Sequence, residues 1–229
     1  MELLRLTQVG KKYVKGKLEV DALLSVDLTI DKGEFLAVVG PSGSGKTTLL
    51  NIIGCLDTAS SGSVRYNGQE LGKMDEKALS DYRKENLGFV FQSYNLIPVL
   101  TVRENVELPL VIEKKIPSRE IRSKVEKIVA QVGLSDKLDR YPAELSGGQE
   151  QRVAIARALV KEPLLVLADE PTANLDSNTA GEIIELMRRI NRENQTTFVF
   201  STHDFLVQKH AARIVTLKDG KIASDERRA

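Results

Sequence analysis

A glycine-rich segment between a short apolar run and an amphipathic stretch is the feature that most limits how this chain can fold. The segment reads Gly40, Pro41, Ser42, Gly43, Ser44, Gly45, Lys46 and Thr47, followed by Thr48. It fits the pattern G-x-x-x-x-G-K-[ST], comes directly after a buried-strand pattern at 36–39 and precedes a helix expected over 49–56. In that context backbone N–H groups converge on phosphate oxygens at a helix N-terminus. A glycine-rich turn that happens to contain a lysine is the alternative.

Further apolar runs at 164–167 and 197–200 contain Val, Leu and Phe without polar alternation. Strands of this kind are covered on both faces, as in a parallel sheet flanked by helices. Residues 3–9 and 22–30 instead alternate apolar with polar side chains, and a short strand at 64–66 enters an Asn67-Gly68 turn. The chain is therefore expected to be α/β, with a mainly parallel sheet and an antiparallel region near the N-terminus.

From about 75 to 145 the pattern becomes mostly helical. Apolar residues three and four apart predict helices at 77–83, 102–108 and 118–132, with interruptions at Pro98, Pro109 and Pro117. We expect a single domain over 1–229, in which 1–92 and 146–229 form the α/β core and about 93–145 form a helical insert subdomain. A hairpin turn at 218–221 is predicted to lead into a polar tail.

Composition excludes several classes of protein. The 229 residues contain 33 basic and 32 acidic side chains, so the net charge is +1 and no nucleic-acid partner is expected. The single cysteine, Cys55, cannot form an internal disulfide; we expect a small buried thiol on the helix after the glycine-rich segment. The start lacks the pattern of a signal peptide, and no apolar run approaches the ~20 residues that cross a bilayer. These features predict a cytoplasmic protein, with any membrane role peripheral.

An acidic pair follows the run at 164–168. Asp169 is expected to anchor Mg²⁺, which Thr47 can also hold. Lys46 is expected to reach the γ-phosphate, and Glu170 is suited to polarise the water molecule that attacks this phosphate. Ligands of open α/β sheets gather at this end of the strands. Alternatively, the pair caps the next turn.

A second anion cradle is predicted at 145–149, just before a helix over 151–160. Ser146 can donate to a phosphate, and Gly147, Gly148 and Gln149 leave backbone N–H groups free. This cradle contains no lysine. Ser146 acting as an ordinary helix N-cap is the alternative, and both interpretations stay open.

The three segments 40–47, 145–149 and 164–170, in this order, resemble those of the ATP-binding subunit of an ABC transporter, and the resemblance covers essentially the whole chain. It implies ATP and Mg²⁺ as cofactors and a P-loop NTPase core. It also implies that Tyr13 stacks on adenine, that Gln92 contacts Mg²⁺ and water, that 174–176 lies between subunits, and that His203 lies near the γ-phosphate. Tyr13 as a strand-edge aromatic and Gln92 as a strand-end cap are the alternatives. We expect His210 to be a solvated helix residue.

The resemblance further implies an ATP-dependent, head-to-tail homodimer. Ser146 to Gln149 of one subunit would close over ATP held by Lys46 of the other, so the cradle without a lysine would meet a phosphate that is already neutralised. The expected catalytic residues are Lys46, Glu170 and His203. The expected metal-binding residues are Thr47, Gln92 and Asp169.

Residues 54–57, 91–98 and 104–110 resemble the subgroup that serves lipoprotein-releasing, macrolide-export and cell-division permeases. The chain departs from the subgroup at Ala59-Ser60, Ala173 and Glu150, which leaves the transported substrate open. The implied partner is an integral membrane permease, which would hold the chain at the inner face of the cell membrane. A non-transport ABC ATPase acting on a soluble or cell-division complex is the alternative.

An apolar cluster follows Gln92 and is expected either to be the insert's own core or to form a socket for a cytoplasmic helix of the permease. Its members are Tyr94, Leu96, Ile97, Pro98 and Leu100.

Overall fold

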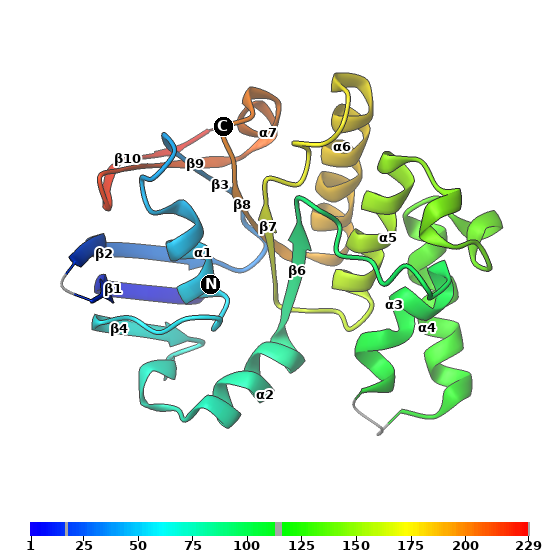
Figure 1. The fold of residues 1–229 in the computed structure, drawn as a ribbon, viewed down its shortest axis with the longest axis horizontal. Coiled ribbons are helices and arrows are strands. Elements are labelled where there is room, and N and C mark those ends of the chain that lie inside the picture. The colour runs from blue at the N-terminus through cyan, green and yellow to red at the C-terminus, as the bar shows by residue number, and fades with distance from the viewer. Residues whose placement is uncertain (17, 113–115, 229) are drawn as a thin grey trace.

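The computed structural model describes residues 1–16, 18–112 and 116–228, and its strands form two sheets (Figure 1). One sheet has the order β2-β1-β4-β5 and is antiparallel, and the other has the order β10-β9-β3-β8-β7-β6. In the second sheet, every pairing from β9 to β6 is parallel, and only β10 is antiparallel. The predicted α/β fold with an antiparallel N-terminal region is confirmed.

The strands are β1 Glu2–Lys15, β2 Leu18–Asp31, β3 Phe35–Val39, β4 Ser61–Tyr66, β5 Gln69–Glu70, β6 Leu87–Phe91, β7 Leu165–Asp169, β8 Thr197–Ser201, β9 Arg213–Lys218 and β10 Lys221–Arg227. The α-helices are α1 Lys46–Ile53, α2 Glu76–Asn86, α3 Val102–Val111, α4 Ser118–Gln131, α5 Gly147–Leu159, α6 Ser177–Asn194 and α7 Phe205–His210. Short 3₁₀ turns occupy Leu71–Lys73, Ser135–Lys137 and Pro142–Glu144.

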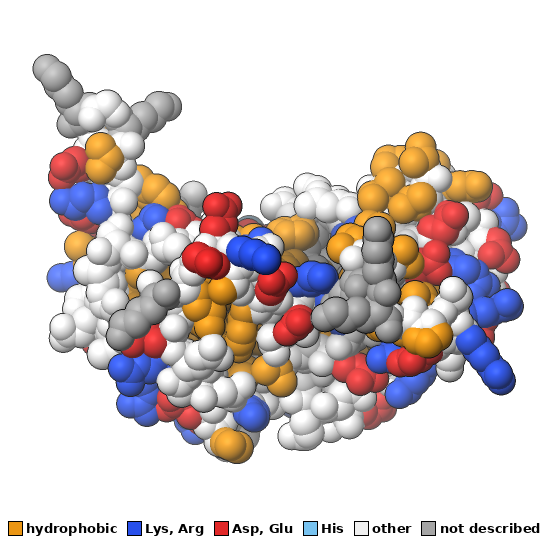
Figure 2. Space-filling model, turned by 90° about the horizontal axis from the view of Figure 1, so that it is seen from below, with side chains coloured by type: hydrophobic (Ala, Val, Ile, Leu, Met, Phe, Trp, Pro, Cys, Tyr) orange, Lys and Arg blue, Asp and Glu red, His pale blue; other side chains and the backbone are white. Residues whose placement is uncertain are grey.

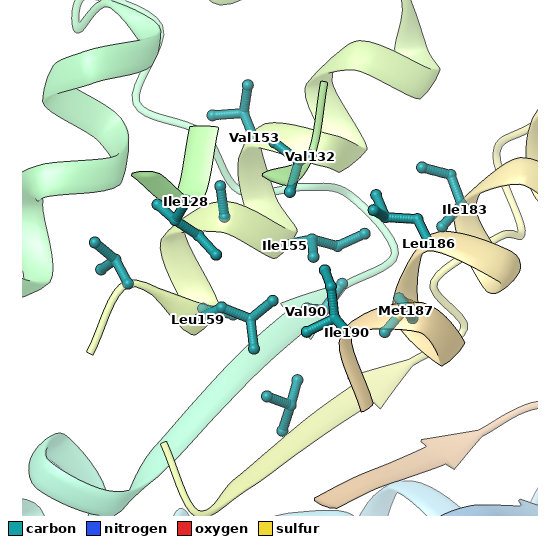
Figure 3. Packing of buried hydrophobic residues seen from close by; sticks show 14 of the residues in the cluster. Val90, Ile128, Val132, Val153, Ile155, Leu159, Ile183, Leu186, Met187 and Ile190 are labelled. Atoms are coloured by element: carbon teal, nitrogen blue, oxygen red, sulfur yellow. The ribbon is translucent and has the colours of Figure 1, made fainter. Parts of the chain in front are cut away.

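The central strands are buried on both faces, which explains their continuous apolar runs. In β7, Val166 and Ala168 pack against the helices α3 to α6, whereas Leu165 and Leu167 pack toward α1 and the antiparallel sheet. Figure 3 shows the first of these cores, where side chains of α4, α5 and α6 converge with Val90 of β6. The parallel strands are thus packed between two hydrophobic cores.

Helices α3 and α4 pack beside α5 on one side of the molecule (Figure 1). Helix α3 runs through Pro109 to Val111, so the predicted interruption at this proline is wrong. A proline removes one helical hydrogen bond, which is tolerated here because it lies in the last turn, and the Ile112 N–H still donates to Leu108 O (3.2 Å). The subdomain boundaries at 92/93 and 145/146 stay a prediction.

Helix α1 begins at Lys46 and ends at Ile53, earlier than expected at both ends, with Gly54 as its C-cap. Cys55 therefore lies just beyond the helix rather than on it, with a φ of 55°. Its side chain is buried as predicted, and burial raises the pKa of the thiol to about 11. At neutral pH this thiol is protonated and unreactive.

Two expectations near the C-terminus are wrong. The hairpin turn predicted at 218–221 is present, but the residues after it form strand β10, which pairs with β9, and not a tail. His210, expected to be solvated, is largely buried, and its Nδ1 lies 2.9 Å from an Oε1 atom of Glu185 on α6. The contact between His210 and Glu185 joins α7 to α6, which become neighbours only when the chain is packed.

Strand β10 is attached through the buried Arg213 of β9. The Arg213 guanidinium makes two hydrogen bonds with the Asp225 carboxylate (2.7 and 2.6 Å) and also contacts Glu34 and the carbonyl of Thr29. The hydrogen bond with Arg213 lowers the pKa of Asp225. The charge of Asp225 therefore stabilises the fold above its unfolded-state pKa of about 3.9, and this stabilisation is lost as the pH falls through the lower folded-state value.

We expect Asp225→Asn to lower the free energy of unfolding at pH 7 by about 1 kcal/mol, because Arg213 loses a charged partner. The effect is modest because Asp225 is partly exposed, and water screens its charge. The difference from the parent should shrink below pH 4, as measured by urea unfolding. Glu226→Gln, at an exposed position of the same strand, is the control. A deficit that stays constant down to pH 3 would contradict the charge-based account.

Candidate functional site

A cleft of about 760 Å³ opens where the carboxyl ends of β3, β6, β7 and β8 meet; we call it the central cleft. Its lining contains most of the predicted site residues. It is formed by Val20, Asp21, Ala22, Gly40, Pro41, Ser42, Gly43, Gly45, Lys46, Thr47, Thr48, Gln92, Asp169, Glu170, Ser201 and His203. Ser44 lies in the same loop but is buried beneath it. The structure thus brings together residues from sequence segments that are more than a hundred positions apart.

The loop at 40–47 requires glycine at positions 40 and 45. Gly40 has a φ of 151°, and a Cβ atom there would lie 2.1 Å from the carbonyl oxygen of Leu217. Gly45 has a φ of 102°, and its Cβ would lie 2.5 Å from Ala22 O. No L side chain fits either conformation or either space, so the loop backbone lies against β2 and β9.

Lys46 begins α1, and its Nζ donates to the carbonyls of Gly40 (2.8 Å) and Pro41 (3.1 Å). The ammonium group therefore lies over the loop. Gly45 is the N-cap, and in the described part of the chain no side chain caps this helix start. Uncapped N–H groups at a helix N-terminus carry positive potential, so an anion in the loop would be stabilised by both the backbone and Lys46.

Asp169 and Glu170 follow one another at the end of β7 and have different environments. Burial raises the pKa of Asp169; the Ser201 hydroxyl lowers it, the Glu170 charge raises it further, and Lys46 lowers it. Glu170 has a φ of 46°, and its N–H donates to Ser201 O (2.9 Å). This turn directs the Glu170 side chain differently from an ordinary strand residue.

The Glu170 carboxylate is held by two neighbours from the segment after β8. Its Oε1 lies 2.6 Å from Nδ1 of His203, and its Oε2 accepts a hydrogen bond from Thr202 Oγ1 (3.1 Å). The His203 side chain is 77% exposed, whereas that of Glu170 is 17% exposed. The predicted pair Glu170 and His203 is therefore in direct contact at the cleft.

Gln92 lies at the cleft immediately after β6. Its carbonyl oxygen accepts a hydrogen bond from Nδ2 of Asn174 (3.0 Å), so the segment after β7 contacts the segment after β6. The Gln92 residue is exposed and lines the central cleft.

Residues 146–149 lie outside the lining of the central cleft. Ser146 is the N-cap of α5: its Oγ accepts from Gln149 N (3.4 Å), and Gln149 Oε1 accepts from Ser146 N (3.0 Å). The ordinary N-cap interpretation is thus realised, and it does not conflict with an anion cradle, because the hydroxyl proton of an accepting serine remains available. Gly148 allows a close approach of α6, since a Cβ would lie 2.4 Å from Cγ2 of Thr179.

Tyr13 also lies outside the lining. It is on β1, is 41% exposed, and its hydroxyl donates to Oδ2 of Asp57 (2.8 Å). The register places Tyr13 opposite Val20 of β2, which does line the cleft. The ring is therefore at the edge of the cleft.

Sequence reasoning missed several residues around the site. Asp204 caps α7 and accepts a hydrogen bond from Thr172 Oγ1 (2.8 Å), which joins the segments after β7 and β8. An N-cap signal before an apolar stretch could have identified Asp204. The β2 residues at 20–22 carry no such signal, because strand alternation does not tell which part of a strand borders a ligand.

The donor set of the central cleft suits a hard cation that is shared with phosphates. Thr47, Gln92 and Asp169 offer a hydroxyl, an amide and a carboxylate oxygen. Among the described residues no cluster of three or more His, Cys, Asp or Glu side chains could hold a metal by itself. One carboxylate plus substrate phosphates is the arrangement that Mg²⁺ uses, so these residues fit Mg²⁺. No described helix combines the length and apolar character that crossing a membrane requires.

The sequence is similar to proteins of one family over nearly its whole length. The family model described as ABC transporter matches residues 23–173. An uncharacterized ABC transporter ATP-binding protein of Thermotoga maritima is 45% identical over 99% of this chain and 96% of that protein. The lipoprotein-releasing system ATP-binding protein LolD 1 of Rhodopseudomonas palustris is 45% identical, over 97% and 99%. The macrolide export ATP-binding/permease protein MacB of Marinobacter nauticus is 44% identical over 97% of this chain and 34% of its own length.

Solved structures agree with the sequence comparison. The dimeric post-hydrolysis state of the ATP-binding cassette MJ0796, bound to ADP and Pi, has a TM-score of 0.89 and 42% identity, covering 99% of this chain and 100% of that one. The structure of cbiO1 from Clostridium perfringens, part of the ABC transporter complex cbiONQ, has a TM-score of 0.90 and 29% identity, covering 99% and 88%.

Proposed function

Since the chain belongs to the ABC transporter family, we propose that it is the ATP-binding and ATP-hydrolysing subunit of a transporter, of the lipoprotein-release or export type. The observation that carries this proposal is the central cleft, where Lys46, Asp169, Glu170 and His203 surround one uncapped helix start. The test is ATP hydrolysis by the purified chain with and without Mg²⁺. A non-transport role is not favoured, since the relatives named above are described as transporter components.

In the proposed site, residues 40–48 bind the phosphates of ATP, with Lys46 neutralising the β and γ groups. Thr47, Gln92 and Asp169 would hold Mg²⁺, which supplies charge neutralisation of the phosphates. Glu170 orients the attacking water and accepts its proton. His203, which contacts Glu170, would donate to the γ-phosphate as charge develops.

The site is completed by a second copy of the chain. We propose a head-to-tail dimer in which residues 146–149 of one subunit cover the γ-phosphate bound by the other. The position of the start of α5 supports this, since residues 146–149 do not line the central cleft of their own subunit. Tyr13, at the edge of the cleft, would stack on the adenine base.

The proposed partner outside this dimer is a membrane permease, which would hold the chain at the inner face of the cell membrane. A second cavity of about 460 Å³, which we call the side groove, lies between α2, α3 and α5, and Figure 2 shows hydrophobic side chains exposed on the lower face of the molecule. It is lined by Leu56, Ser80, Arg83, Lys84, Leu87, Gly88, Phe89, Phe91, Asn95, Leu108, Pro109, Ile112, Arg157, Ala158 and Lys161. Its apolar floor and basic residues suit a permease segment with apolar and acidic side chains.

The side groove differs from the apolar cluster predicted after Gln92. Leu96 packs against the main core, so for this residue the core interpretation holds. Arg157 of α5 donates to the carbonyls of Tyr94 (2.7 Å) and Asn95 (2.6 Å), which ties the segment after Gln92 to the groove wall. A movement of Gln92 on nucleotide binding would thus reach the groove.

We expect Ile112→Asp, in the groove and 61% exposed, to leave basal ATP hydrolysis within about twofold of the parent and to reduce co-purification with the permease at least tenfold. The physical reason is the burial of a carboxylate against an apolar partner surface. Val111→Asp, exposed but outside the groove, is the matched control. Equal permease recovery with both variants would place the docking surface elsewhere.

A further inference from the structure

The Tyr13 ring is anchored to the segment that follows helix α1. Its hydroxyl donates to Oδ2 of Asp57, a residue 44 positions away that lies just beyond the end of α1. The second carboxylate oxygen of Asp57 lies 2.5 Å from Nζ of Lys11, and this Nζ also donates to Thr58 O (2.8 Å). The phenol is thereby connected to the segment after α1 through the Asp57 side chain, which Lys11 also contacts.

Lys11 also restrains the ring itself. Its Nζ lies 5.0 Å from the ring centroid of Tyr13, over the ring, which is a cation–π contact. The Lys11 side chain is only 11% exposed, whereas Tyr13 keeps 41% of its surface exposed. One face of the ring is therefore covered by the ammonium group, and accessible aromatic surface remains at the edge of the central cleft.

The charges in this cluster are suited to the contact. Burial acts to raise the pKa of Asp57. Hydrogen bonds from Lys11, Tyr13 and the Thr58 N–H nevertheless hold this pKa below its ordinary value. Burial and then the Asp57 hydrogen bond raise the pKa of Tyr13. At neutral pH a protonated phenol thus meets an ionised carboxylate, and a charge-assisted hydrogen bond of this kind is stronger than one between neutral groups.

We propose that Asp57, held by Lys11, is a positioning residue that fixes the Tyr13 ring as the platform on which the adenine base stacks. The inference rests on the proposed nucleotide site and names residues that act on it from outside. An aromatic side chain on a hairpin would otherwise lose rotational freedom when a base stacks on it. Fixing it beforehand removes that cost from binding, which is worth about two- to tenfold in affinity.

The test compares ATP with tripolyphosphate, which carries the phosphates and no base, by calorimetric titration of the full chain with Mg²⁺. We expect Asp57→Ala to lower the affinity for ATP about two- to tenfold and to leave the affinity for tripolyphosphate unchanged. Tyr13→Phe, which removes one exposed oxygen and keeps the ring, should give the same selective loss. The double variant should bind ATP no more weakly than the worse single variant, because both changes break one contact.

The matched control is Glu19→Ala, which removes an exposed ion pair with Lys12 (2.8 Å) on the same hairpin and should change neither affinity. Partial recovery in Asp57→Asn, whose amide oxygen still accepts the phenol proton, would support the proposal. Equal weakening of both ligands in Asp57→Ala, or fully additive effects in the double variant, would overturn it. A parent chain that binds tripolyphosphate and ATP equally would also overturn it, and one that binds neither would overturn the proposed function itself.

Discussion

Glu170→Gln is expected to lower the turnover of ATP by a factor of the order of 10² or more while ATP still binds. The amide keeps the size of the carboxylate and can still accept a hydrogen bond from Thr202, so the turn after β7 should remain intact. It cannot accept a proton from water, however, and it no longer offers a carboxylate to His203. The measurement is steady-state phosphate release at saturating ATP, together with the ATP dissociation constant.

Two variants sharpen this experiment. Lys46→Ala should instead weaken nucleotide binding, because the ammonium over the loop is lost. Glu182→Gln removes an exposed carboxylate of α6 that pairs with Arg152, and it should change neither binding nor turnover. If Glu170→Gln hydrolysed ATP like the parent, Glu170 would not be the group that positions the attacking water.

Ser146→Arg is expected to abolish the ATP-dependent dimer. With ATP, Glu170→Gln should form a stable dimer, since stalled hydrolysis and the loss of one negative charge both favour the closed interface. An arginine at position 146 places a long side chain where the partner's phosphate must approach, and it also removes the N-cap of α5, which costs about 1 kcal/mol. Size-exclusion chromatography with light scattering would report the masses of Glu170→Gln with and without the second change.

The control is Ser118→Arg, the same substitution at the exposed start of α4, which should leave the dimer intact. A dimer that survives Ser146→Arg would remove residues 146–149 from the interface. Persistence of the Glu170→Gln variant as a monomer at saturating ATP would count against the head-to-tail arrangement.

The sequence alone determined those features that depend on neighbouring residues. The phosphate loop is predictable because its glycines, its lysine and the following helix are consecutive, and the positive φ angles of Gly40 and Gly45 permit few other residues. The acidic pair is predictable for the same reason, as it directly follows a strand whose unbroken apolar run indicates burial on both faces. These local patterns specified the α/β fold, and the candidate roles of Lys46, Asp169 and Glu170 stay predictions that the variants above test.

Only the tertiary structure decided contacts between distant segments. Tyr13 contacts Asp57, His210 contacts Glu185, and β10 is attached through Arg213. No local sequence pattern predicts any of these partners. The physical reason is that periodicity states which face of an element is buried, whereas the partner on that face depends on how whole elements pack. The edge of the central cleft at β2, and the contacts that orient Tyr13 there, exist only once the two sheets and α1 are assembled.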